Sequence, residues 1–191
     1  MDFFSALVVY ISIVLAAAVT RVLSGLAFLV QERERVEWDW LIPAWGLFFV
    51  FAGAAQWWNL LSGWRLLPAY SIGQFLFLIL QPLIGYFFVA LFFPRFAPTG
   101  RIDLHSHIVH VRSWGYPLAA CYVLLYIIDD ALLRTASRGV GPQELDWPQA
   151  LTTGAAAGLI LTGAFLRNFR YDRLLFVAVV LLMAFLYAFL A

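Results

Sequence analysis

The chain has 191 residues, of which 64% are hydrophobic and 12% are charged. Soluble domains contain roughly 45–50% apolar and about 25% charged residues, so this composition excludes an ordinary soluble domain. The net charge of +1 gives no basic surface for nucleic acid, and we expect no such partner. Cys121 is the single cysteine and lysine is absent, which excludes an intrachain disulfide, a Cys-cluster zinc site and Schiff-base chemistry.

Six apolar segments predict six transmembrane helices, because a helix needs roughly 20 apolar residues to cross a bilayer core of about 30 Å. Only Met1 and Asp2 precede the first segment, so we expect it to remain as a span rather than act as a cleaved signal. We expect an all-α bundle in the lipid bilayer, one transmembrane domain over residues 1–191 with helices at about 3–30, 41–61, 70–93, 116–133, 150–166 and 174–191.

Tryptophans mark the ends of the predicted helices. Trp40 and Trp58 are separated by about 27 Å of helix, which matches the thickness of the hydrocarbon core. An aromatic belt at both headgroup levels explains them, and a pigment or quinone pocket is the alternative. The group comprises Trp38, Trp40, Trp45, Trp57, Trp58, Trp64, Trp114 and Trp147.

Arginines are distributed unevenly between the two sides of this predicted bundle. The connections after the first, third and fifth segments carry eight arginines, and the other side carries three. The positive-inside rule then places both termini outside the cytoplasm. We therefore expect a bacterial inner-membrane protein with this orientation.

Polar residues interrupt the first and third segments. Arg21 has three interpretations, namely a snorkelling interfacial residue, a buried ion pair or hydrogen-bond clamp, and an anion, lipid or substrate site. Gln74 and Gln81 each need a partner or water within a bilayer. Pro82 offers no N–H to the carbonyl of Leu78, so the helix can open next to Gln81. Broken helices of this kind line cavities in some transporters, and they are also ordinary kinks.

The end of the fourth segment carries a polar stripe. Tyr122, Tyr126 and Asp130 follow one another at four-residue spacing, and Asp129 can reach the same face. A charged Asp that faces lipid is costly, so we expect the stripe to face the bundle interior or an outward vestibule. A cation or proton entry site is the functional interpretation. A hydrated helix end and a pair of catalytic carboxylates are the alternatives.

The three histidines lie within residues 101–110, and we interpret this segment as an amphipathic stretch at the interface. In that interpretation Ile102, Leu104, Ile108 and Val111 face lipid. A metal site formed by His105, His107 and His110 and a proton-transfer role are the alternatives. Because all histidines lie in one segment, a haem held between helices is not expected. We assign no cofactor, metal or catalytic residue.

Gly154, Gly158 and Thr162 form a face of small residues at four-residue spacing in the fifth segment. Such faces allow two helix backbones to approach closely. We expect Gly154 and Gly158 to pack directly against another helix of the bundle. A seam between copies in a homo-oligomer is the alternative.

Two function classes fit these features. In the first, the protein is a small channel or transporter for a small solute or ion, with a pathway along the Gln81-Pro82 kink, the tyrosines and the aspartates. In the second, it is a non-catalytic accessory or assembly subunit of a larger complex with other membrane protein subunits. An enzyme acting on lipid headgroups is less favoured, because no nucleophile, complete metal set or acid–base pair is placed for it.

Overall fold

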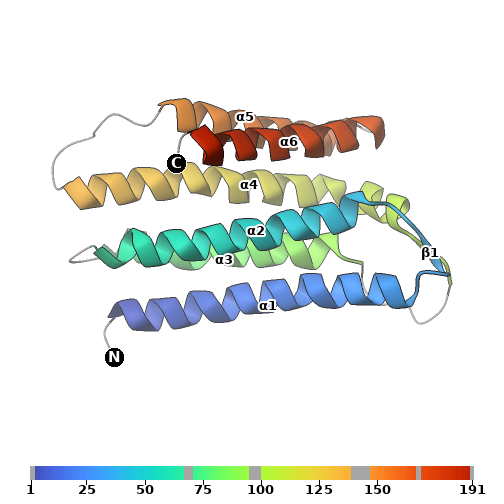
Figure 1. The fold of residues 1–191 in the computed structure, drawn as a ribbon, viewed down its shortest axis with the longest axis horizontal. Helices are drawn as coiled ribbons and strands as arrows, with labels where there is room; N and C mark the ends of the chain where they lie inside the picture. Colours follow the sequence, from blue (N-terminus) through green and yellow to red (C-terminus); the bar gives the residue numbers. More distant parts are fainter. Residues whose placement is uncertain (1–2, 67–70, 95–99, 139–146, 167–168, 190–191) are drawn as a thin grey trace.

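The computed structural model describes residues 3–66, 71–94, 100–138, 147–166 and 169–189. These residues form six α-helices that run side by side along one long axis, which confirms the all-α prediction (Figure 1). The elements are α1 (Phe3–Gln31), β1 (Val36–Glu37), α2 (Leu41–Ser62), the 3-10 turn η1 (Trp64–Leu66), α3 (Ile72–Phe92), β2 (Ile102–Asp103), α4 (Leu104–Arg138), α5 (Trp147–Phe165) and α6 (Phe169–Phe189).

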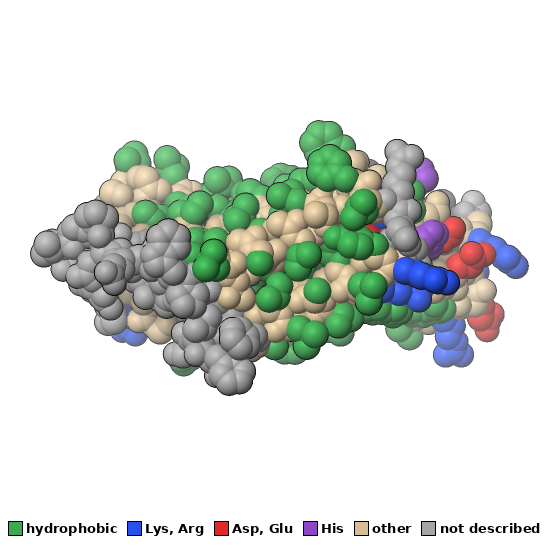
Figure 2. Space-filling model, turned by 90° about the horizontal axis from the view of Figure 1, so that it is seen from above, with side chains coloured by type: hydrophobic (Ala, Val, Ile, Leu, Met, Phe, Trp, Pro, Cys, Tyr) green, Lys and Arg blue, Asp and Glu red, His purple; other side chains and the backbone are tan. Residues whose placement is uncertain are grey.

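Four stretches of the described helices are long and apolar enough to cross a bilayer, namely Phe4–Gln31, Leu41–Ser62, Ile72–Phe92 and Leu104–Asp129. The outer surface of the bundle carries large apolar side chains, such as Ile13, Phe51 and Ile72, which are 64%, 74% and 79% exposed. Figure 2 shows the histidine side chains and most of the visible charged side chains gathered at one end, beyond an apolar middle. These features indicate a membrane protein. That α5 and α6 also cross the membrane stays a prediction.

The helix α4 begins at Leu104 rather than at about residue 116. The side chain of Asp103 caps its start, because Oδ1 accepts a hydrogen bond of 3.0 Å from the backbone N–H of Ser106. Leu104 and Ile108 are fully buried within the protein core. The interpretation that these side chains and Ile102 face lipid is therefore wrong. The helix α6 likewise begins earlier than predicted, at Phe169 rather than at about residue 174.

The helix α4 lies inside the bundle, between α3 and α5. The helix α1 packs on α3, whereas α6 packs on α5 and also touches α2 (Figure 1). Aromatic rings fill the space between them, with the Trp45 and Phe88 centroids 5.9 Å apart and those of Phe88 and Phe92 4.9 Å apart. Trp45 and Trp64 are buried, so they do not belong to an interfacial belt.

Five tryptophans of the described residues are exposed; four of them lie at or near the ends of α2, whereas Trp114 lies ten residues into α4, so the aromatic belt stays a prediction. They are Trp38, Trp40, Trp57, Trp58 and Trp114.

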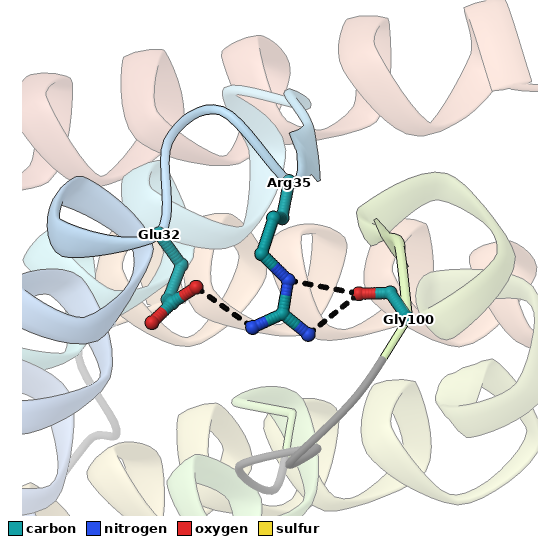
Figure 3. A network of polar contacts seen from close by, with 3 residues as sticks. All are labelled: Glu32, Arg35 and Gly100. Carbon is teal, nitrogen blue, oxygen red and sulfur yellow. Dashed lines mark hydrogen bonds and ion pairs between the residues drawn. The ribbon is translucent and has the colours of Figure 1, made fainter.

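A parallel two-stranded ladder ties two connections together at the charged end of the bundle. Val36 of β1 is paired with Ile102 of β2. Arg35 donates to the carbonyl oxygen of Gly100 from Nε at 3.2 Å and from Nη2 at 2.8 Å, and its Nη1 lies 2.9 Å from a carboxylate oxygen of Glu32 (Figure 3). Gly100 has a φ of +103°, which side-chain-bearing residues rarely adopt. These contacts join the α1–α2 connection to the start of α4.

Candidate functional site

A small cavity lies inside the bundle and is lined by residues of α1, α2, η1, α3 and α4. Its volume is about 10 Å³, which is near the minimum that holds one water molecule. Apolar walls come from Ile11, Leu60 and Leu78. The polar lining residues are Gln56, Trp64, Gln81 and Asp129. The cavity therefore combines an apolar surrounding with a few converging polar groups, which is the usual composition of a binding site.

Asp129 contributes a buried carboxylate to this cavity, with 5% of its surface exposed. The indole Nε1 of Trp64 donates a hydrogen bond of 2.9 Å to Oδ1 of Asp129. Trp64 lies in η1, directly after α2, so this turn brings the indole onto the end of the α4 span. The side chain of Asp130, the other member of the predicted pair, lies outside the described residues.

Gln81 is the least satisfied polar side chain of the cavity. It is 1% exposed, and neither its Oε1 nor its Nε2 has a hydrogen-bond partner. A buried polar group without a partner costs about 1–3 kcal/mol. Pro82 follows directly, and because proline has no N–H, the carbonyl of Leu78 loses the partner that a regular helix gives it. The amide of Gln81 and the carbonyl of Leu78, which each need a hydrogen-bond partner, thus belong to residues that line the same cavity.

Gln56 and Tyr122 complete the polar interior on the facing helices. The hydroxyl of Tyr122 donates to Oε1 of Gln56 at 3.0 Å, and both side chains are buried. Tyr126, one turn further along α4, instead donates to the backbone carbonyl of Ala52. The predicted stripe therefore divides, since Tyr122 and Asp129 point to the interior and Tyr126 binds the backbone of α2.

Arg21 lies away from this cavity and binds the end of α3. Its Nη2 donates to the carbonyl oxygens of Phe93 at 3.1 Å and Pro94 at 3.3 Å. The ring Nε2 of His107 lies 3.3 Å from the carbonyl oxygen of Leu91 at the same helix end. A cation near the last carbonyls of a helix is favourable, so these contacts fit the hydrogen-bond clamp among the interpretations of Arg21.

Gln74 also lies apart from the cavity, at the start of α3. Its backbone N–H donates to Oγ of Ser71 at 3.2 Å, while its Oε1 accepts from the backbone N–H of Ser71 at 2.8 Å. This reciprocal pair is a capping box. The bonds satisfy Gln74 locally and leave Gln81 as the third-helix glutamine that reaches the interior.

A second buried polar cluster lies at the opposite end of α4. Arg112 forms an ion pair with Asp172 of α6 and donates from Nη1 to the carbonyl oxygen of Leu166 at 3.0 Å. Both charged side chains are buried. The neighbouring hydroxyl of Tyr116 and indole nitrogen of Trp45 have no hydrogen-bond partner in the described residues. This cluster was missed in the sequence analysis, because Arg112 and Asp172 both lie outside the apolar segments from which the helices were predicted.

Two glycines of α5, Gly154 and Gly158, are uncovered, whereas a Cβ on Gly163 would lie 3.1 Å from the ring of Tyr116. Apart from the adjoining residues and the backbone of α5 itself, no described atom lies within 4 Å of a Cβ placed on Gly154 or Gly158. The expectation that they pack against another helix of the bundle is therefore wrong for the described chain, because α4 and α6 cover other faces of α5. Thr162 donates to the carbonyl oxygen of Leu159 at 2.6 Å and contacts the hydroxyl of Tyr171 in α6.

An apolar groove of about 440 Å³ lies between α2, α4, α5 and α6. Rings of Phe48, Phe51 and Phe176 line it together with Met183, and Tyr126 forms part of its wall. The groove has few polar atoms and no charged side chain among the described residues that line it. It can therefore accommodate an apolar chain, such as a lipid tail, but these residues offer no acid–base or nucleophilic pair for catalysis.

Comparison with protein families, curated proteins and solved structures finds no match. In the described part of the chain, no three His, Cys, Asp or Glu side chains come together as metal ligands. The functional argument therefore rests on the geometry of the cavity.

Proposed function

We propose that this protein is a small membrane transporter or channel that moves a proton or a monovalent cation through the bundle, past Asp129. The observation that carries the proposal is the buried Asp129 carboxylate, which lines a water-sized cavity together with the unpartnered amide of Gln81. Ionisable residues inside transmembrane bundles are costly, and they commonly mark ion or substrate pathways. The small cavity favours an ion over an organic solute.

The cavity extends from one end of the bundle toward its middle, because Trp64 follows the end of α2 whereas Gln81 lies near the middle of α3. Gln81 lies nine residues into α3, which corresponds to about 14 Å of helix. The described basic residues of the α1–α2 and α3–α4 connections lie at the other end of the bundle, beside β1 and β2. In our proposal all six helices cross a bacterial inner membrane with both termini outside the cytoplasm. The cavity then reaches from the outer side of the membrane to about the bilayer centre.

Electrical measurements on reconstituted vesicles test this proposal. Currents are recorded on a supported membrane after jumps in H⁺, Na⁺ or K⁺ concentration, with empty vesicles as the background. We expect the wild-type protein to give a current for at least one of these ions, and Asp129→Asn to lose it. Asp103→Asn changes an exposed carboxylate at the far end of α4 and serves as the matched control. Absence of current with all three ions would contradict the proposal.

A second candidate function is an accessory or assembly subunit, and the uncovered face of α5 favours it. Gly154 and Gly158 leave space for a close helix approach that the described chain does not use. Purification in mild detergent distinguishes the two candidates. A stoichiometric second membrane protein supports the accessory role, whereas a stable homo-oligomer or monomer that conducts ions supports transport.

A further inference from the structure

We propose that the cavity between Gln81 and Asp129 binds one dehydrated sodium ion. This inference rests on the proposed transport of a cation and names the ion. The starting point is the amide of Gln81, which is fully buried, lines the cavity and has no hydrogen-bond partner at either polar atom. A buried amide without a hydrogen-bond partner is stabilised by a ligand that binds to its polar atoms.

The volume of the cavity limits the bound ligand to one small ion or molecule. A volume of about 10 Å³ accommodates roughly one water molecule. An ion with its hydration shell therefore cannot enter. A bare sodium ion is smaller than a water molecule, whereas a bare potassium ion is about as large as one, so the smaller ion fits more easily into a cavity near the minimum size for water. The ion must exchange its hydration shell for oxygen atoms of the protein.

The cavity brings together several oxygen atoms that can replace that shell. The carboxylate of Asp129 carries negative charge, and the amide of Gln81 offers Oε1. Oε1 of Gln56 accepts one hydrogen bond from Tyr122 and retains a second lone pair. Pro82 removes the helical partner of the Leu78 carbonyl, and Leu78 lines the same cavity. In sodium-coupled transporters, backbone carbonyls freed by a helix break coordinate the ion.

The same set of groups argues against other cations. A proton needs only the carboxylate and a water molecule, and the amides of Gln56 and Gln81 do not titrate. Ca²⁺ takes six to eight oxygen ligands, and Mg²⁺ keeps several waters around it. Asp129 supplies the single described carboxylate of this cavity. A cavity with the volume of about one water molecule has too few oxygen ligands for Ca²⁺ and no room for the waters that Mg²⁺ keeps. A monovalent ion balances one carboxylate and uses the neutral oxygens, so it fits best.

The experiment measures sodium binding by the purified full chain in detergent, separately from any flux. Unfolding temperature is recorded in NaCl, KCl and choline chloride at equal ionic strength, and binding of radioactive ²²Na⁺ is measured directly. We expect a saturable rise of the unfolding temperature with NaCl only, because a ligand of the folded state stabilises it. We expect Asp129→Asn and Gln81→Leu to weaken sodium binding by about tenfold or more.

Two further variants keep the result interpretable. Gln31→Leu makes the same change at an exposed position at the end of α1 and should leave sodium binding unchanged. Should Gln81→Leu fail to fold, Gln81→Asn keeps the amide but retracts its oxygen, and we expect it to weaken binding as well. Equal unfolding temperatures in all three salts, or full ²²Na⁺ binding by both Asp129→Asn and a folded Gln81 variant, would overturn the site.

The outcome separates this inference from the proposed function. Proton currents in vesicles without sodium binding in detergent would overturn the sodium site and leave transport through Asp129 standing. Sodium binding that depends on Gln81 and Asp129, without current for any ion, would support the site and contradict the transport function.

Discussion

The guanidinium of Arg112 in α4 lies against the carboxylate of Asp172 in α6, and both side chains are buried in the protein. Because Arg112 also donates to the carbonyl oxygen of Leu166, the residue directly after α5, one side chain joins three helices. Asp172 lies in the first turn of α6, and Arg112 lies eight residues after the first residue of α4. The ion pair fixes α5 and α6 on α4, so it shapes the outer wall of the bundle rather than the cavity.

The first prediction concerns this ion pair. Removing one partner leaves a buried charge alone, so Arg112→Leu or Asp172→Leu should destabilise the fold by about 3–5 kcal/mol. The double variant should be more stable than either single variant, because no charge is left without a partner. Unfolding temperature in detergent measures all three. A double variant as unstable as the sum of the singles would contradict the coupling.

An exposed ion pair provides the control for this measurement. Arg101 and Glu37 lie 3.6 Å apart at the surface, and such pairs contribute less than about 1 kcal/mol. Arg101→Leu should therefore leave the unfolding temperature almost unchanged.

The second prediction concerns close packing around Phe93. A Cβ placed on Gly46 would lie 2.5 Å from Cζ of Phe93, and the buried ring also overlaps the Cβ position of Gly25. Gly46→Ala should therefore destabilise the bundle by about 1–3 kcal/mol. Gly158→Ala, where space is open, should be close to neutral in the monomer. Equal unfolding temperatures for the two variants would mean that the ring moves aside without cost.

The third prediction concerns the capping box of α3. Ser71→Ala removes the side-chain acceptor for the backbone N–H of Gln74, and we expect a loss of about 1 kcal/mol. Sodium binding should be unchanged, because Gln74 does not line the cavity. A loss of sodium binding in Ser71→Ala would show that the start of α3 controls the site.

The sequence contained enough information to predict the helices but not the beginning of α4. Apolar runs of sufficient length predict helices directly. Sequence patterns assign Arg112 and the histidines to a polar connection between helices. Sequence alone does not show that a buried carboxylate lies next to Arg112 in the folded protein. Asp172 supplies that carboxylate from α6, so α4 extends through this region as a regular helix.

The candidate site was predicted in part, and the missing part depends on small rotations. Seven residues return to within about 20° of the same helix direction, whereas eight turn about 80° away. Asp129, seven residues after Tyr122, therefore faces the interior with it. The four-residue spacing favoured Asp130, and without the packing of Trp64 the two aspartates cannot be distinguished.

Gln74 and Gln81 illustrate a local signal that was overlooked. Both interrupt an apolar run, so hydropathy treats them alike. Ser71 precedes Gln74 by three residues, which is the sequence pattern of a capping box and assigns Gln74 a structural role. Gln81 has no such neighbour, and its burial becomes visible only when α1, α2 and α4 surround it.

The fourth prediction is the topology. Reporter fusions after Arg35, Arg101 and Arg170 should all report a cytoplasmic position, because the basic connections are expected on that side. The fusion after Arg170 also tests whether α5 crosses the membrane. A periplasmic signal at any of the three would contradict six spans with both termini outside.

The most direct test of a cation pathway through Asp129 is tracer exchange in vesicles. Vesicles that contain the protein are loaded with NaCl and diluted into a trace of ²²Na⁺, so that the outward sodium gradient drives accumulation of the label. We expect wild-type vesicles to accumulate ²²Na⁺ well above empty vesicles, and Asp129→Asn vesicles to match the empty ones. Accumulation that is equal in wild-type and empty vesicles, or undiminished in Asp129→Asn, would contradict a sodium pathway through this residue.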